Sequence, residues 1–401
     1  MVSGFGNCKY LVISVENFYQ LLYYKLLKPI NFQMRYGWPF GTTKHIMAFN
    51  HNGWSEDSKK MIPSAIAFFH FDQEPLYTKD QTTLYDGFLV ARPYRYPQIL
   101  ANSERSRLKK YFCRENNLLD WYFFYHGFAA LDWYRDAFYL DSDRAITCAF
   151  MTLNHLVMQK RSYRMAMIAR LWQQRLLDRG IVSFHASHQS CAEEINHPDC
   201  ELSAHSKMLI QNFIDSKNNL PIMAHPGKVD GSASAHFGHR EYELRQQALF
   251  TVVNETVFFD DKLHLTEKIF QPIVCGRPFI LTGAPGNLQY LRSYGFRTFG
   301  DYIDESYDSE SDPDRRMDLI TQQIENLCAR SLPELNAMLK DMRPILEHNK
   351  RHFFGDFKTM IVDELVENFD QSIRTWNNGR VDGRIYSLHP DTESVKRVLL
   401  A

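Results

Sequence analysis

The sequence predicts an α/β protein built from two successive domains, and three observations point to this fold class. Apolar runs that stop at polar residues and lead into helical patterns recur along the chain, which is typical of strand–helix units. The chain has 401 residues, 44% of them hydrophobic, so it can bury two cores of ordinary size. Residues 250–283 read as strand, loop, helix and strand, the unit that builds a parallel sheet.

The first domain is expected over residues 1–145, which hold several short apolar runs that each stop at polar residues. Strands of an open α/β sheet end in this way, and ligands bind beside their carboxyl ends. The predicted strands are residues 66–71, 88–91, 99–101 and 122–125, and a helix is predicted at 105–115.

The second domain is expected over residues 146–355 and carries four more apolar runs with strand character. These are residues 149–153, 181–184, 250–253 and 278–281. A histidine-rich stretch at about 185–248 is predicted to be a helical insertion, and residues 314–349 are predicted to be helical. The last segment, 356–401, begins with an amphipathic helix that we expect to return to the first domain.

Polar side chains gather at one strand end and at the helix start that follows it. Asn254 and Glu255 end the strand, and the helix opens with Thr266, a typical N-cap residue. Glu267 and Lys268 come next. A carboxylate can accept two hydrogen bonds from a ribose diol, and an ammonium beside it can neutralise a diphosphate. A Glu–Lys pair at a helix start is also common on protein surfaces, so this pattern alone leaves both interpretations open.

A second polar group follows the strand predicted at 149–153, which stops at Asn154. Arg161 and Arg164 lie at the start of an amphipathic helix predicted at 161–171. A planar guanidinium at a helix start suits bidentate binding of a phosphate. The alternative is an arginine on a solvated helix face.

In order and spacing, these two groups resemble the donor-binding domain of the α-1,3-fucosyltransferases and, more loosely, that of the exostosin-like glycosyltransferases. The resemblance covers about residues 146–300, and the matching residues are Arg164, Leu171, Thr266, Glu267, Lys268, Gly276, Pro278 and Gly283. The sequence departs from the family where Asn254-Glu255 inverts a Glu–Asn order. It departs again at His264-Leu265, where the family has Tyr and a small apolar residue, and the Gly276 turn is one residue shorter. The donor base and sugar therefore stay open.

The resemblance implies a GT-B architecture, in which two Rossmann-like domains face a cleft and a C-terminal helix returns to the first domain. It implies a glycosyltransferase, either a hexosyl- or a pentosyltransferase, that moves a sugar from a nucleoside diphosphate sugar to an acceptor hydroxyl. We expect no cofactor beyond this co-substrate and no essential metal ion.

The resemblance also implies roles for residues of the second domain. Arg164, with Arg161 as a second choice, and Lys268 are expected to hold the donor diphosphate. Glu267 is expected to bind the ribose, and the pair that ends the strand is expected to contact the sugar or the ribose edge. Gly283 is expected to let backbone amides approach the diphosphate. The expected donor-binding residues are Arg161, Arg164, Asn254, Glu255, Thr266, Glu267, Lys268 and Gly283.

The base is expected from the first domain, because in this architecture the acceptor binds there. A carboxylate or an imidazole would take the proton of the acceptor hydroxyl. Glu74 and then Asp72 are the preferred candidates, since two neighbouring carboxylates raise the pKa of one of them. His126 is the third candidate, although a buried, hydrogen-bonded histidine would look the same. Glu104 is interpreted as a helix cap, and the choice between inverting and retaining chemistry stays open.

The acceptor is expected to be a glycan, a protein or a hydroxylated base in viral DNA. Segments 72–75, 126–132 and 285–288 resemble a group of uncharacterised proteins from tailed phages. The chain has 46 Lys and Arg against 47 Asp and Glu, so no global basic field favours nonspecific binding of nucleic acid.

Two other functions are left as alternatives. The chain could keep the nucleotide pocket without catalysis and act as a binding protein. Asp141 and Asp143 could instead hold a metal ion in a metal-dependent transferase of the GT-A type, although we interpret them as a turn. The histidines and cysteines between residues 185 and 200 match no strict zinc spacing.

A cytoplasmic location is expected, inside the host cell if a phage encodes the chain. Seven cysteines, an odd number, are spread widely and suggest reduced thiols. The N-terminus lacks the pattern of a secretory signal, and no stretch is apolar enough to span a bilayer. The oligomeric state stays open.

Overall fold

A computed structural model describes the chain in segments. These are residues 10–14, 33–37, 46–50, 66–72, 98–102, 110, 113–114, 118–122, 124–139, 145–216, 220–224 and 239–378. The chain divides into two compact units, Met1–Ala129 with Lys358–Ala401, and Ala130–Phe357. The division falls earlier than the expected boundary at residue 145, and the chain from Lys358 onward is grouped with the first unit.

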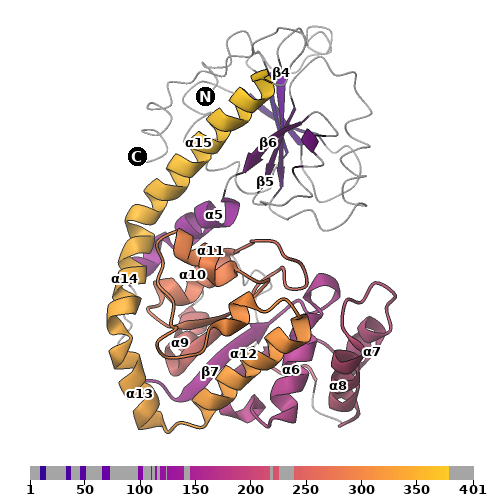
Figure 1. Ribbon diagram of the computed structural model, residues 1–401, viewed down its shortest axis with the longest axis vertical. Coiled ribbons are helices and arrows are strands. Elements are labelled where there is room, and N and C mark those ends of the chain that lie inside the picture. Colours follow the sequence, from indigo (N-terminus) through magenta and orange to yellow (C-terminus); the bar gives the residue numbers. More distant parts are fainter. Residues whose placement is uncertain are drawn as a thin grey trace. The chain divides into compact units, whose positions relative to one another are not determined.

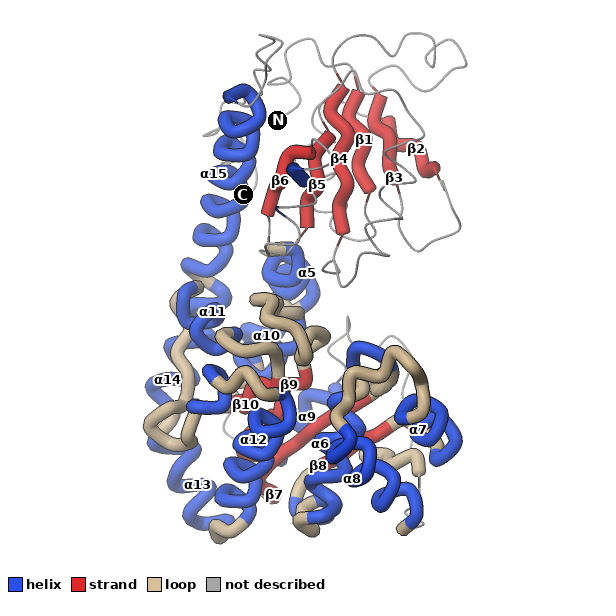
Figure 2. The backbone as a smooth tube through the Cα atoms, turned by 45° about the vertical axis from the view of Figure 1, so that its right-hand side comes forward, coloured by secondary structure: helices blue, strands red, loops and turns tan. Residues whose placement is uncertain are grey.

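The first unit contains a mixed six-stranded sheet in the order β2-β3-β1-β4-β5-β6 (Figure 2). Its strands are β1 (Tyr10–Ser14), β2 (Gln33–Gly37), β3 (Ile46–Asn50), β4 (Ile66–Asp72), β5 (Gln98–Asn102) and β6 (Leu118–Tyr122). Strands β1, β4, β5 and β6 are parallel, and β3 runs antiparallel to both of its neighbours. The long helix α15 (Asp356–Asn378) meets this sheet where Asn368 Nδ2 donates to the carbonyl oxygen of Tyr122, at 3.3 Å.

The strand predicted at 122–125 is wrong, because β6 ends at Tyr122 and helix α5 (Tyr125–Trp133) begins at Tyr125. His126 therefore lies in the first turn of a helix and does not end a strand. A short apolar run cannot be assigned to a strand or to a buried helix by its periodicity, and α5 consists mostly of apolar residues, with Phe128 and Ala130 buried. The strand predicted at 88–91 lies outside the described residues.

The second unit is built on a parallel sheet of four strands in the order β10-β9-β7-β8. The strands are β7 (Cys148–Asn154), β8 (Ile181–Phe184), β9 (Ala248–Asn254) and β10 (Phe279–Thr282), each at the position predicted from its apolar run. The chain runs from β7 outward to β8 and then returns to the other side of β7 to form β9. This reversal is a topological switch point, and open α/β sheets bind ligands beside the carboxyl ends of the strands there.

Eleven α-helices lie in the described part of the chain. Those of the second unit not yet introduced are α6 (Tyr163–Gln173), α7 (His188–Ile195), α8 (Ala204–Asp215), α9 (His239–Gln247), α10 (Glu267–Val274), α11 (Asn287–Ser293), α12 (Pro313–Cys328), α13 (Leu332–Asp341) and α14 (Arg343–Phe354). Helix α12 packs on β7, and α6 contacts both α8 and α12 (Figure 1). Helix α10 packs on β9, β10 and α14.

The segment predicted to be helical at 314–349 forms three helices. The first break follows Cys328, and Ser331 then starts α13 through a capping box with Glu334. In a capping box the Ser side chain accepts from a backbone amide of the helix that follows, and the Glu side chain accepts from the Ser amide. The capping box therefore fixes where α13 begins after the end of α12. No helix among the described residues is long and apolar enough to cross a membrane.

Candidate functional site

A buried polar network joins the carboxyl ends of β7, β8 and β9. Asn254 Nδ2 donates to Thr152 Oγ1 at 2.8 Å and to Asn154 Oδ1 at 2.9 Å. Asn154 Nδ2 in turn donates to the carbonyl oxygen of Ser183, at 3.2 Å. All four residues are buried, so these bonds replace water and hold the two strands that flank the switch point in register.

Arg164 lies in the first turn of α6, and its guanidinium donates to backbone carbonyl oxygens. Nη1 donates to Leu156 O at 2.6 Å, and Nη2 donates to Asn254 O at 2.7 Å and to Glu255 O at 3.1 Å. Arg164 is 4% exposed. The guanidinium expected to bind the diphosphate therefore ties α6 to the end of β9 in this structure. Arg161 is partly exposed at the end of a 3-10 turn, η5 (Gln159–Arg161).

Glu255 is fully buried and its carboxylate faces the start of α10. Oε1 accepts from the amide of Thr266 at 3.1 Å, and Oε2 accepts from Thr266 Oγ1 at 2.6 Å. Burial raises the pKa of Glu255, while the nearby Lys268 charge and the two Thr266 bonds act against that rise. Both residues expected to contact the sugar, Asn254 and Glu255, thus direct their side chains into the protein.

Thr266 is the N-cap of α10, as predicted, and its hydroxyl oxygen accepts from the amide of Lys268 at 3.4 Å. The side chain of Lys268 returns to the same hydroxyl, with Nζ 3.0 Å from Thr266 Oγ1. Lys268 Nζ also lies 3.2 Å from Glu267 Oε1, and the Lys268 side chain is 29% exposed. The side chains of Thr266, Glu267 and Lys268 therefore contact one another beside the switch point, at the carboxyl end of the sheet.

The backbone amides after Gly283 already have acceptors within the chain. The amide of Gly286 donates to Asp308 O at 2.7 Å, and the amides of Leu288 and Gln289 donate to the Asp308 carboxylate at 2.8 and 3.1 Å. Burial raises the pKa of Asp308, and the bonds from the start of α11 act against that rise. The loop amide of Gly286 and the first amides of α11 thus bind Asp308, in the region where backbone amides were expected to approach a diphosphate.

A similar arrangement occurs at the first helical segment after each of β7, β9 and β10. After β7, the amide of Gln159 donates to the buried carboxylate of Glu194, at 2.7 Å. Glu255 binds the start of α10, and Asp308 binds the start of α11. Helix starts attract anions, and at this edge the chain supplies the anions itself. Lys268, in the first turn of α10, and Arg161, in the turn before α6, are partly exposed cations at this edge.

Three buried polar atoms at this edge have no hydrogen-bond partner in the described part of the chain. They are Asn254 Oδ1, Ser162 Oγ and Thr282 Oγ1, at the end of β9, the start of α6 and the end of β10. Unsatisfied buried polar atoms are uncommon in folded proteins. Their occurrence along the carboxyl edge of the sheet shows that this edge carries polar atoms that the packing of the described residues does not pair.

Aromatic side chains at this edge were not singled out from the sequence. Tyr163 stacks on Phe258 with ring centroids 4.2 Å apart, and its hydroxyl donates to Glu255 O at 2.5 Å. Phe259 meets Tyr163 edge-on at 6.3 Å and is partly exposed. The available signal in the sequence was the Phe258-Phe259 pair, which closely follows the polar end of β9. A partly exposed aromatic side chain near a nucleotide site can stack on a base.

The three base candidates belong to the first unit. Asp72 is the last residue of β4, a strand end as predicted, and its side chain is not described. Glu74 lies outside the described residues. His126 is buried in α5, at 6% exposure.

The histidines and cysteines of segment 185–200 are not gathered into one site. Cys191 is buried, and burial raises the pKa of its thiol to about 12. The ring of His185 lies 5.1 Å from that of His155, and burial together with this second imidazole lowers the pKa of His185. Among the described residues, no group of three or more His, Cys, Asp or Glu side chains is placed to hold a metal ion. Asp141 and Asp143 lie outside that part of the chain.

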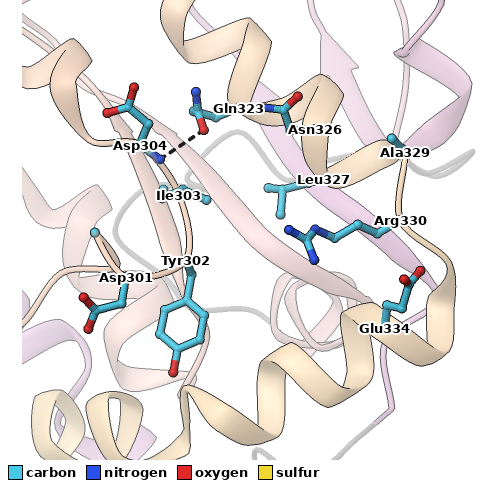
Figure 3. A pocket seen from close by; sticks show the side chains of 11 residues that line it. Asp301, Tyr302, Ile303, Asp304, Gln323, Asn326, Leu327, Ala329, Arg330 and Glu334 are labelled. Carbon is cyan, nitrogen blue, oxygen red and sulfur yellow. Dashed lines mark hydrogen bonds between the residues drawn. The ribbon is translucent and has the colours of Figure 1, made fainter.

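A cavity of about 820 Å³ lies away from this edge, between α12, α13 and the loop at 300–304. Figure 3 shows Arg330 and Leu327 directed into it and the hydrogen bond from the Asp304 amide to Gln323 Oε1, at 3.1 Å. Its lining residues are Gly300, Asp301, Tyr302, Ile303, Asp304, Gln323, Asn326, Leu327, Ala329, Arg330 and Glu334. None of the predicted donor-binding residues lines it.

No family model, no curated protein and no solved structure matches this chain.

Proposed function

We propose that the chain is a glycosyltransferase that moves a sugar from a nucleoside diphosphate sugar to an acceptor hydroxyl. One observation carries the proposal: the Thr266-Glu267-Lys268 sequence starts α10 directly after β9, beside the switch point of a parallel sheet. Nucleotide-binding α/β domains hold phosphates at this position. The polar atoms along the same edge that have no partner within the described part of the chain, including Asn254 Oδ1, add support.

In this proposal Lys268 is the main ligand of the diphosphate, and Glu267 binds the ribose. Lys268 Nζ has two acceptors within the protein, Thr266 Oγ1 and Glu267 Oε1. An ammonium group has three hydrogens, so one is left for a phosphate oxygen. Arg164 holds backbone carbonyls, and its contribution to phosphate binding is indirect. Arg161, partly exposed at the start of α6, is the second candidate cation.

The finer parts of the proposal concern the partner domain and the acceptor. The GT-B arrangement assigns acceptor binding to the first unit, with Glu74 or Asp72 as the base and no metal ion on the diphosphate. The acceptor is a glycan or a hydroxylated base of viral DNA. The GT-B arrangement follows from the resemblance of the donor motif to the fucosyltransferases, and the viral DNA acceptor follows from the resemblance of segments 72–75, 126–132 and 285–288 to proteins of tailed phages.

The test is calorimetric titration of the full chain with UDP, GDP, ADP and CDP and their sugar conjugates, in the presence of a chelator. We expect one nucleotide to bind, and Lys268→Ala to weaken it about 10- to 100-fold, the cost of a hydrogen bond to a charged group. Lys340→Ala, an exposed lysine at the end of α13, is the matched control and should bind as wild type does.

Three outcomes would count against the proposal in different ways. If no nucleotide binds, the donor site is rejected. If binding survives Lys268→Ala, the phosphates lie elsewhere. If a nucleotide sugar binds but is never consumed with any acceptor, the chain is a nucleotide-binding protein without catalysis.

A further inference from the structure

The hydroxyl of Thr266 lies between the Glu255 carboxylate and the Lys268 ammonium. It is 2.6 Å from Glu255 Oε2 and 3.0 Å from Lys268 Nζ. A hydroxyl has one donor hydrogen and two lone pairs. The ammonium can only donate and an ionised carboxylate can only accept, so the order of the bonds is Lys268 to Thr266 to Glu255. The second lone pair receives the amide of Lys268, at 3.4 Å. We call this set the Glu255–Thr266–Lys268 relay.

The carboxylate end of the relay is fixed on several sides. The amide of Glu255 donates to Thr282 O at 2.9 Å, at the end of β10. Its carbonyl oxygen accepts from Tyr163 Oη at 2.5 Å and from Arg164 Nη2 at 3.1 Å, both on α6. Glu255 is fully buried. The residue thus joins β9, β10 and α6, and it cannot shift without disturbing all three.

The lysine end of the relay reaches the surface. The Lys268 side chain is 29% exposed, whereas Glu267 beside it is 6% exposed. A free lysine side chain samples many rotamers, and fixing it on ligand binding costs entropy. A lysine already held by a buried anchor avoids much of that cost, which is the general benefit of preorganisation.

We propose that Glu255 is a positioning residue that holds the Lys268 ammonium, through the Thr266 hydroxyl, in the place where it meets a phosphate of the donor. The inference rests on the proposed function for the identity of the ligand. The relay itself belongs to the free protein and can be tested without any ligand.

The first test compares Thr266→Val, which has the same shape without the hydroxyl, with Thr266→Ser, which keeps it. In titrations with the nucleoside diphosphate that binds wild type best, we expect Thr266→Val to weaken binding about tenfold more than Thr266→Ser does. Thr251→Val, in the strand that ends just before Glu255 and with no partner for its hydroxyl among the described residues, is the matched control and should not weaken binding.

A double-mutant cycle then separates positioning from general damage to the fold. If the relay acts through Lys268, Thr266→Val should have no further effect on nucleotide binding once Lys268→Ala is present. Additive losses in the double variant would overturn the inference, because they would show that Thr266 acts independently of the lysine.

The second test uses the free protein and an amine-acetylating reagent, with peptide mass spectrometry as the readout. Lys268 in Thr266→Val should be acetylated about threefold faster than in Thr266→Ser, because the ammonium loses its buried acceptor, while Lys340 should react equally in both. Equal rates at Lys268 would overturn the relay whatever the nucleotide result. Failure of every nucleotide to bind, with unequal rates at Lys268, would instead reject the proposed function and the phosphate role.

Discussion

Replacing Arg164 by methionine distinguishes a structural arginine from a ligand-binding one. The guanidinium is buried at 4% exposure and donates to the carbonyl oxygens of Leu156, Asn254 and Glu255. Tyr163 also donates to the last of these, so two of the three carbonyls are left without a side-chain donor in the variant. A hydrogen bond to a charged group contributes about 1.5–3 kcal/mol. The free energy of unfolding should therefore fall by about 3–5 kcal/mol, slightly offset by the added apolar contact of Met.

The assay is hydrogen exchange in increasing urea, read from peptides of β7 and β9 so that it reports the second unit alone. Arg161→Met is the control: the residue is partly exposed in the preceding turn, and its loss should cost less than about 1 kcal/mol. If Arg164→Met costs no more than this control in the free protein, the carbonyl-binding role is refuted. The arginine would then be available to bind a phosphate directly, as its sequence position suggested.

Two further predictions concern single buried groups of β9 and its end. Thr251 is 4% exposed and its hydroxyl has no partner among the described residues, so Thr251→Val should raise the free energy of unfolding by about 1 kcal/mol, measured by urea unfolding; a decrease would contradict this. Burial raises the pKa of Glu255, so the folded chain holds that proton more tightly than the unfolded chain does. The stability from this proton is present at low pH and is lost as pH rises from the ordinary carboxyl range through the raised pKa. The stability advantage of wild type over Glu255→Gln should thus be larger at about pH 5 than at about pH 8, and an advantage that grows with pH would contradict the assignment.

The sequence located the strands of the second unit because their signal is local. Each strand is a run of apolar residues that stops at a polar one, such as β9 at Asn254. The cap of α10 was equally local, since Thr266 acts on an amide two residues away. His126 was misplaced because a short, mostly apolar stretch has no period that separates helix from strand.

The roles of the polar residues were harder to predict from the sequence because their partners are distant in the chain. Arg164 was expected to face a diphosphate, and two of the carbonyls that it contacts are about 90 positions away. Asp308 was given no role from the sequence, although its carboxylate accepts hydrogen bonds from the amides at the start of α11. No local sequence pattern predicts that a carboxylate of an acidic loop will accept hydrogen bonds from the amides at the start of another helix.

The sequence by itself determined the α/β class, the four parallel strands and the position of the Thr266-Glu267-Lys268 group at a helix start. These depend on side-chain periodicity and capping, which act over a few residues. Only the tertiary structure decided that the strand order reverses at β7 and that Glu255 lies behind Thr266. It also decided that the chain's own carboxylates bind the helix starts along the edge. Strand order and long-range hydrogen bonds follow from how the whole core packs, because a buried donor or acceptor takes the partner that packing brings to it.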